Sequence, residues 1–380
     1  MKIKVLVIDD SSVIRDILTA IINEQPDMMV VGGAPDPLVA RDMIRQLNPD
    51  VLTLDIEMPH MNGLSFLKRL MSVRPMPVVM VSSHTREGSD IAFRALSLGA
   101  VDFISKPQLG QGSVANYARQ IAETIRGAHA ARDSLQRIDA SRVPDAAVVL
   151  PDLANDAIGK SSIIAIGTST GGAEAVREIL AAIPADCPPV FVALQMPAAF
   201  TRHFALRLDE LCRAKVKVPE NGEPALPGHV YLAPGDAQLT VERYGTRGFG
   251  VRLAPSAEGS AADPLFASAA RAAGRDAIGV ILTGRGGDGA AGLLEIRNAG
   301  GYTVAQDEAT SIVFGMPRAA IDAGAACDVA ALGQIAKLVL GHLAAEAQGA
   351  QASPFVTHTT ASGDTSVAAV TNTTPRVTTG

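Results

Sequence analysis

The stretch KVLVIDDSSVIRDILTAII, residues 4–22, decides the fold of the first part of the chain. Residues 4–8 carry a continuous apolar run, which is typical of a strand buried on both faces of a sheet. From Val13 to Ile22 the apolar residues recur at helical spacing instead. The same change of period repeats along the first 127 residues, with further strand candidates at 28–32, 51–54, 78–81 and 101–104. Alternating strands and helices predict a parallel sheet with helices on both faces.

Residues 128–160 interrupt this alternation, since they contain Pro144 and Pro151 and have no sustained period. They predict a linker. Strands and helices alternate again from Ile163, and residues 213–260 predict a β-rich insertion in this second part. The chain after residue 345 is rich in Thr, Ser and Ala, which predicts disorder. We therefore predict α/β domains over residues 1–127 and 161–345, a linker over 128–160 and a disordered tail over 346–380.

Composition excludes several classes of protein. The chain has 33 basic and 39 acidic side chains and a net charge of -6, which argues against a broad nucleic-acid-binding face. Its three cysteines lack metal-ligand spacing, so we expect reduced thiols in a cytoplasmic protein. The N-terminus does not resemble a signal peptide. The sequence contains no stretch of 18 or more apolar residues free of charge, so we predict no membrane-spanning segment.

Five polar side chains follow the predicted strands of the first domain. Asp9 and Asp10 end the first strand, Asp55 and Ser82 end two others, and Lys106 follows the last. Because ligands of parallel sheets sit beyond the carboxyl ends of the strands, these groups should share one pocket. Clustered carboxylates favour Mg²⁺, and one of them can attack phosphorus to form an aspartyl phosphate. Lys106 would then pair with the phosphate and Ser82 would donate a hydrogen bond to it.

These residues resemble the response-regulator receiver domains, which have a flavodoxin-like fold. The matching motifs are Asp9-Asp10, Asp55 within LTLDIEMPHMNG, Ser82-Ser83 and Lys106-Pro107. The resemblance implies that a histidine kinase phosphorylates Asp55. It also implies that Asp10, Asp55 and the main-chain carbonyl of Glu57 bind Mg²⁺. Phe103 stands where that family carries a switching aromatic residue.

A possible nucleophile follows the first strand of the second domain. Residues 163–166 lead into GTSTGG, residues 167–172, and then into a helix, which is the context that a G-x-S-x-G nucleophile turn requires. The glycines would leave Ser169 exposed, and the helix N-terminus would offer N–H groups to a developing oxyanion. The pattern fits a phosphate-binding turn equally well.

A second glycine loop, GRGGDG at residues 284–289, satisfies G-x-G-x-x-G. Asp307 lies 18 residues after Gly289, near where a ribose-binding acid would stand, so a dinucleotide site is a competing interpretation. Asp288 argues against it, because its carboxylate would repel a pyrophosphate. The same acid suits the orienting member of a Ser-His-Asp triad.

The second domain resembles the chemotaxis-type protein-glutamate methylesterases/protein-glutamine glutaminases, the CheB family. The matching stretches include IGTSTGGAEAVREIL, GVILTGRGGDGAAG and AQDEATSIVFGMPRAAI. The resemblance implies a doubly wound α/β fold that hydrolyses glutamate methyl esters on methyl-accepting chemoreceptors and deamidates certain glutamines. It assigns Ser169 as the nucleophile and Asp288 as the orienting acid.

The chain departs from that family at the position of its catalytic histidine, where ALQMP has Gln195. An amide cannot take a proton from serine near neutral pH, and losing the base of such a unit costs about 10⁶ in kcat. Arg285 also stands where the family has a methionine. Residues 254–265 lack the Arg-Pro-Ser-Val-Asp-type run that flanks the substrate groove in that family. The alternative histidines are His203, His229 and His342, each of which we expect to be solvated or packed.

Three functions remain open from the sequence. The first is a methylesterase gated by phosphorylation of Asp55. The second is a catalytically impaired regulatory or binding homologue with a phosphorylatable receiver, which Gln195 favours. The third and most distant is a dinucleotide-binding protein.

Overall fold

The apolar runs of the first part of the chain form a five-stranded parallel sheet, in the order β2-β1-β3-β4-β5. The computed structural model describes residues 2–58, 63–82, 86–106, 114–132, 134–135, 162–196, 198–245, 248–255 and 260–351. The strands are β1 (Ile3–Ile8), β2 (Met28–Ala34), β3 (Val51–Asp55), β4 (Val78–Ser82) and β5 (Asp102–Ser105). The helices are α1 (Ser12–Asn23), α2 (Pro37–Leu47), α3 (Gly63–Val73), α4 (Arg86–Ser97) and α5 (Val114–Ala130).

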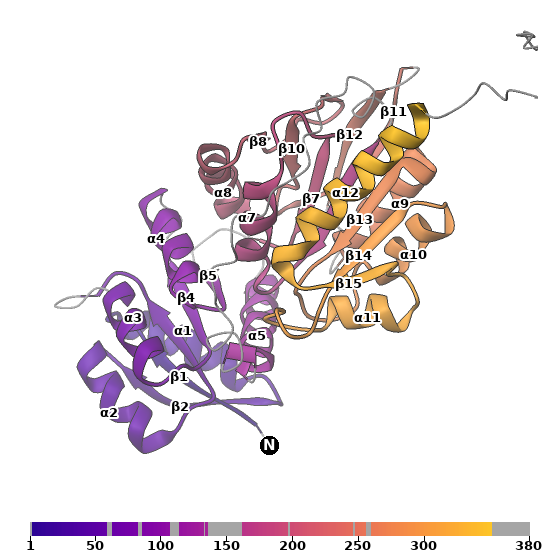
Figure 1. Ribbon diagram of the computed structural model, residues 1–380. Helices are drawn as coiled ribbons and strands as arrows, with labels where there is room; N and C mark the ends of the chain where they lie inside the picture. The colour runs from indigo at the N-terminus through magenta and orange to yellow at the C-terminus, as the bar shows by residue number, and fades with distance from the viewer. Residues whose placement is uncertain are drawn as a thin grey trace, which may run out of the picture.

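The second part forms a seven-stranded parallel sheet, in the order β15-β14-β13-β6-β7-β10-β8. Its strands are β6 (Ile163–Thr168), β7 (Val190–Leu194), β8 (Lys215–Lys217), β10 (His229–Leu232), β13 (Ala277–Ile281), β14 (Tyr302–Gln306) and β15 (Asp328–Ala330). Its helices are α7 (Gly172–Ala182), α8 (Ala198–Leu211), α9 (Ala262–Ala273), α10 (Ala290–Asn298), α11 (Met316–Asp322) and α12 (Leu332–Gln351), with a short 3₁₀ turn at Gly274–Asp276. The α/β prediction for both parts is confirmed (Figure 1).

The β-rich segment divides between two sheets. β8 and β10 extend the main sheet in parallel, whereas β9 (Pro224–Ala225), β11 (Ala237–Tyr244) and β12 (Gly248–Pro255) form a separate antiparallel sheet. Residues 346–351, which the sequence assigned to a disordered tail, form the last turns of α12. Most of the predicted linker, residues 136–160, and the rest of the tail lie outside the described residues. No helix in the described part of the chain is long and apolar enough to cross a membrane.

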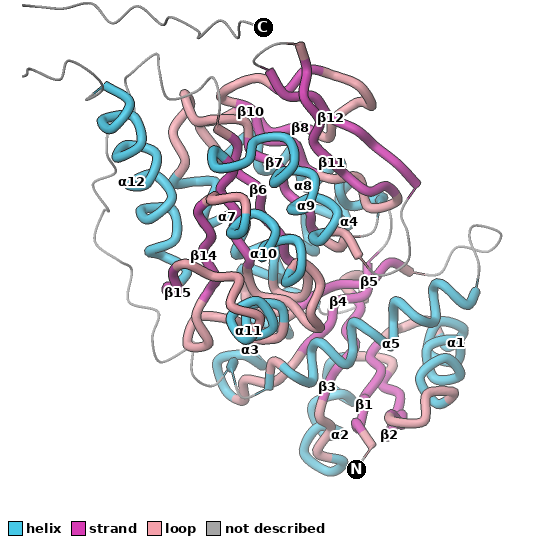
Figure 2. The backbone as a smooth tube through the Cα atoms, turned by 90° about the vertical axis from the view of Figure 1, so that its right-hand side faces the viewer, coloured by secondary structure: helices cyan, strands magenta, loops and turns pink. Residues whose placement is uncertain are grey.

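The two units meet along α4, β5 and α5 of the first (Figures 1 and 2). Phe93 on α4 stacks on Phe204 of α8, with ring centroids 4.9 Å apart. Phe103 on β5 lies 4.5 Å from Phe200, also on α8. All four rings are buried, so the two units share one continuous apolar contact.

Phe266 on α9 supports both glycine loops of the second unit. The ring is fully buried. A Cβ added to Gly167 would lie 2.8 Å from it, and one added to Gly289 would lie 3.0 Å from it. The loops before α7 and α10 therefore rest on this ring through residues that have no side chain.

We expect Phe266→Ala to lower the free energy of unfolding of the second unit by about 3–5 kcal/mol, because it leaves a cavity beneath both loops. Urea denaturation followed by circular dichroism measures the change. Leu206→Ala is the matched control: this side chain is 55% exposed on α8, so a change within about 0.5 kcal/mol is expected. Similar losses in both variants would contradict the assignment of Phe266 as a support.

Candidate functional site

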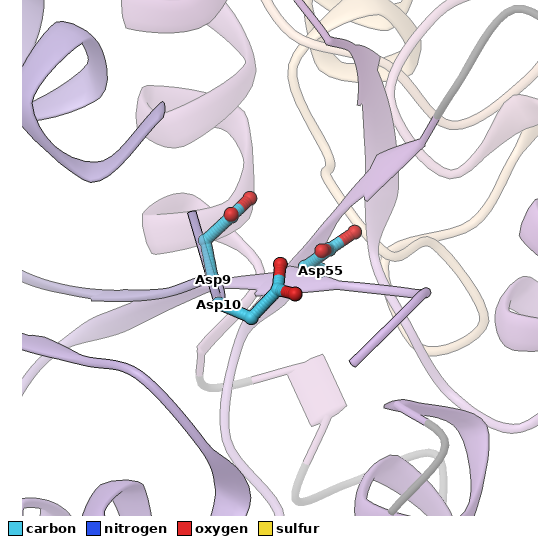
Figure 3. A group of neighbouring side chains, drawn as sticks. All are labelled: Asp9, Asp10 and Asp55. Atoms are coloured by element: carbon cyan, nitrogen blue, oxygen red, sulfur yellow. The ribbon is translucent and has the colours of Figure 1, made fainter. Parts of the chain in front are cut away.

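Three carboxylates meet at the carboxyl edge of the first sheet. Asp9 and Asp10 follow β1 and Asp55 ends β3, and one oxygen atom from each lies within 4.8 Å of the others (Figure 3). Asp9 and Asp55 are buried, and Asp10 is exposed. Asp9 Oδ2 is buried and has no hydrogen-bond partner among the described residues. Burial, reinforced by the charge of Asp55, raises the pKa of Asp9 to about 6.

This arrangement suits a hard divalent cation. Carboxylate oxygens are the ligands that Mg²⁺ prefers, and a cation would satisfy the buried Asp9 oxygen and offset the repulsion among the three acids. The sequence assigned Asp10, Asp55 and the Glu57 carbonyl to this site, and the structure adds the Asp9 carboxylate to the group. The main-chain N–H of Glu57 donates to Asp55 Oδ1 at 3.2 Å, which orients the carboxylate.

Lys106 and Ser82 complete the pocket. Lys106 Nζ lies 2.8 Å from Asp55 Oδ2 and 3.8 Å from Asp9 Oδ2. Burial raises the pKa of Asp55, and the hydrogen bond from Lys106 opposes that rise. Ser82 is fully buried at the end of β4, where its carbonyl accepts a hydrogen bond from the Lys106 N–H at 2.8 Å. The structure thus gathers these predicted residues at one strand edge; Ser83 and Pro107 lie outside the described residues.

Ser169 lies where β6 turns into α7, beside the loop that follows β13. Its Oγ accepts a hydrogen bond from the main-chain N–H of Arg285 at 3.0 Å. Two further bonds join the loops: Thr168 Oγ1 donates to the Thr283 carbonyl at 2.6 Å, and Thr283 Oγ1 donates to the Thr170 carbonyl at 3.1 Å. The nucleophile turn is therefore held by main-chain and hydroxyl contacts.

Ser169 is 6% exposed, whereas the glycine turn suggested an exposed serine. The loop after β13 packs against the side chain, because a Cβ added to Gly284 would lie 2.5 Å from Ser169 Oγ. A Cβ added to Gly127 of α5 would lie 2.7 Å from Thr170 Oγ1, so the first unit packs directly against the neighbouring residue. Both contacts join segments that are distant in the sequence, so no local pattern reveals them.

Asp288 is held by four donors from one segment of the chain. Its carboxylate accepts hydrogen bonds from Ser260 Oγ at 2.7 Å and from the main-chain N–H groups of Ala261, Ala262 and Asp263 at 2.8, 3.0 and 3.0 Å. The Asp288 side chain therefore caps the N-terminus of α9, where main-chain N–H groups have no helical acceptor. Sequence patterns did not reveal these four donors, because they lie 25–28 positions before Asp288 and meet it only in the folded domain.

Gln195 contacts Asp288 through a long hydrogen bond. Its Nε2 lies 3.5 Å from Asp288 Oδ2, and the side chain is exposed just after β7. The structure thus places Gln195, the position that the sequence assigned to a triad base, next to Asp288. A primary amide can donate to Asp288 and offers its oxygen as an acceptor, but it cannot become a protonated base.

Ser169 and Gln195 line a cavity of about 710 Å³ between the two units. No described residue that lines it is a histidine. His229 Nδ1 lies 3.0 Å from the Pro227 carbonyl oxygen, and His342 stacks on Tyr302 with ring centroids 4.3 Å apart. His203 lies on α8. The structure places none of the three alternative histidines in the cavity wall.

The glycine loop 284–289 lies between β13 and α10, as the sequence predicted. Gly289 is the N-cap of α10, with a φ of 90°. Asp307, the residue considered for ribose binding, accepts hydrogen bonds from the Thr310 N–H and hydroxyl at 2.9 and 2.6 Å. Its carboxylate closes the turn after β14.

Comparisons with known proteins assign a family to each of the two parts. Residues 5–114 match the response regulator receiver domain family, and residues 164–339 match the CheB methylesterase family. A protein-glutamate methylesterase/protein-glutamine glutaminase 3 of Burkholderia lata is 51% identical over 350 residues, covering 90% of this chain and 96% of its own length. A protein-glutamate methylesterase/protein-glutamine glutaminase of Chromohalobacter salexigens is 52% identical, covering 92% and 98%.

Two solved structures from Thermotoga maritima match the separate parts. The CheB methylesterase catalytic domain is 34% identical, covering 48% of this chain and 98% of its own, with a TM-score of 0.46. The response regulator domain of CheB is 49% identical, covering 34% and 97%, with a TM-score of 0.31. The chain belongs to the CheB family of protein-glutamate methylesterases/protein-glutamine glutaminases, with a receiver domain ahead of its methylesterase domain.

Proposed function

We propose that this chain is a phosphorylation-regulated methylesterase that hydrolyses glutamate methyl esters, and deamidates glutamines, on methyl-accepting chemoreceptors. A histidine kinase of the same pathway would phosphorylate Asp55. The observation that carries the proposal is the hydrogen bond of 3.0 Å from the Arg285 N–H to Ser169 Oγ, at the turn where a serine hydrolase of this family places its nucleophile. Family membership and the identity to named methylesterases support the same reaction.

The reaction is acyl transfer through Ser169. Its Oγ attacks the ester carbonyl, methanol leaves, and water then cleaves the acyl-serine to release the glutamate. The Arg285 N–H lies beside the nucleophile and can donate to the oxyanion of the tetrahedral intermediate. Asp288 holds the side chain at position 195 through the 3.5 Å contact.

Gln195 supports a second candidate function, a regulatory homologue with little catalytic power. The side chain can orient Ser169 but cannot accept its proton, and no histidine among the described residues lines the cavity. An oxyanion donor and substrate binding alone leave roughly 10³–10⁴-fold acceleration over water. The two candidates therefore differ in rate, not in fold or binding partner.

Regulation follows from the contact between the units. The receiver domain packs against Thr170, next to Ser169, through Gly127 of α5, and its Phe103 touches Phe200 on the helix that follows Gln195. Phosphate at Asp55 would engage Lys106 and Ser82 at the ends of β5 and β4, and so shift the equilibrium toward separated domains. Mg²⁺ held by Asp9, Asp10 and Asp55 would neutralise charge during phosphoryl transfer.

Restoring the imidazole tests the role of Gln195. We expect Gln195→His to raise kcat for methanol release from methylated receptor by several orders of magnitude, because a base then faces Ser169. Ser169→Ala in the same background is the control and should abolish the gain. If the parent already releases methanol as fast as Gln195→His, the impaired candidate is wrong and another group takes the proton.

Phosphorylation of Asp55 is tested in the Gln195→His background. Acetyl phosphate with Mg²⁺ should accelerate methanol release, and Asp55→Asn should remove the acceleration while leaving the unstimulated rate in place. An Asp55→Asn protein that hydrolyses the receptor esters as fast as the phosphorylated parent would show that the domains are not gated in this way.

Closure of the domains should weaken as the pH rises. Burial at the interface raises the pKa of Asp102 to about 7, although the Thr170 hydroxyl and the positive charge of Arg285 oppose the rise. Opening exposes the carboxyl and returns its pKa toward the ordinary value of 3.8. The closed form thus binds the proton more tightly, so closure is favoured at low pH and is progressively lost as the pH rises to about 7.

Hydrogen–deuterium exchange of residues 168–172, corrected for the intrinsic effect of pH, measures this closure. We expect protection to fall between pH 5 and about 7, and Asp102→Asn to remove most of that dependence. The Glu123–Arg285 ion pair faces the same loop and remains in the variant. An Asn variant that keeps the whole pH dependence would rule out Asp102 as its source.

A further inference from the structure

Arg285 connects the nucleophile to the receiver domain. Its main-chain N–H donates to Ser169 Oγ, while its guanidinium Nη2 pairs with Glu123 Oε2 of α5. Its positive charge also lowers the pKa of Asp102 on β5, against the effect of burial. Both carboxylates that face this guanidinium therefore belong to the receiver domain.

The methylesterase domain offers Arg285 no replacement among its described residues. Asp288, three positions on, points its carboxylate at Ser260 and the N-terminus of α9. Asp307 is bound by Thr310. Within the part of the chain that the structure describes, the ion pair with Glu123 is the only one that Arg285 forms. When the domains separate, the guanidinium loses its counter-charge.

The loop cannot carry Arg285 away from Ser169. Gly284 donates its N–H to the Val313 carbonyl at 2.9 Å, and its own carbonyl accepts from the Met316 N–H at 2.8 Å. A Cβ on Gly284 would lie 2.3 Å from Met316 Sδ and 2.5 Å from Ser169 Oγ. The main chain at Gly284 is enclosed on both sides, so the backbone of Arg285 stays beside Ser169 and the freed guanidinium remains on a side chain that starts there.

We propose that Arg285 determines substrate specificity by exchanging Glu123, in the closed protein, for a carboxylate of the substrate in the open protein. The substrate class is an acidic protein segment in which an unmodified glutamate or aspartate lies beside the methyl ester. The inference rests on the proposed function for the identity of the ester. The inference adds that Arg285, which pairs with the receiver domain in the closed protein, also selects the substrate in the open protein.

The two partners compete for one cation. A carboxylate beside the ester recovers the ion pair that separation breaks, whereas an amide there accepts a hydrogen bond from the guanidinium but supplies no counter-charge. Arg285 is 30% exposed in the closed protein, so the preference should be that of a partly screened pair, about 5-fold in affinity. It should also shrink as the salt concentration rises.

Binding tests this without requiring catalysis. The full chain carries Ser169→Ala, so that no peptide is consumed, and Glu123→Gln, so that Arg285 lacks its receiver counter-charge. Phe93→Ala and Phe103→Ala are added because the aromatic contacts with Phe204 and Phe200 would otherwise keep the domains closed without phosphorylation. Two helical peptides each contain one glutamate γ-methyl ester, flanked at i−4 and i+4 by glutamate in one peptide and glutamine in the other. Fluorescence anisotropy measures both dissociation constants.

We expect the acidic peptide to bind about 5-fold more tightly, with the preference kept in Arg285→Lys and lost in Arg285→Met. Circular dichroism and thermal unfolding check that both variants fold. Equal affinity for the two peptides, or a preference that survives Arg285→Met, overturns the inference. The binding assay does not measure methanol release. An inactive parent protein would therefore contradict the proposed catalysis alone, whereas the absence of a peptide preference would contradict the proposed role of Arg285 alone.

Discussion

The close approach of two strand-to-helix loops is the constraint on which the remaining structure depends. The loop after β6 and the loop after β13 exchange hydrogen bonds through Thr168, Thr283 and Ser169. Their main chains can meet because Gly284 has no side chain, and both loops rest on Phe266 through Gly167 and Gly289. A parallel sheet places β6 beside β13, so Ser169 and the Arg285 N–H that donates to it are adjacent although 116 positions separate them.

The same loops form the surface against which the receiver domain packs. α5 touches Thr170 through Gly127, and Val313, from the loop that holds Gly284, belongs to an apolar cluster made mainly of receiver residues. A signal that moves α5 or β5 therefore reaches Ser169 without passing through the methylesterase core. The aromatic contact between Phe103 and Phe200 gives α8, and hence the segment containing Gln195, a second direct link to the receiver.

The periodicity of the sequence predicted both parallel sheets, because each long strand is an uninterrupted apolar run. It also predicted the acidic pocket, since Asp9, Asp55 and Lys106 stand at strand ends that a parallel sheet brings to one edge. It could not assign β8 and β10 to the main sheet, because strands of three and four residues carry too little pattern to reveal a partner. The enclosure of Ser169 by the loop after β13 and the Glu123–Arg285 pair were equally hidden, since each contact joins segments that are far apart in the sequence.

The hydrogen bonds of Asp288 make its environment independent of the residue at position 195. In a serine hydrolase the acid is stabilised partly by the histidine that it orients. Here four donors from Ser260 and the start of α9 bind the carboxylate at 2.7–3.0 Å, so its hydrogen bonds do not require an imidazole at position 195. A glutamine at that position therefore leaves no buried charge without partners and costs the fold little. The stability of the domain and its capacity to transfer a proton are therefore separate properties of this chain. The hydrogen bonds around Asp288 bear only on stability.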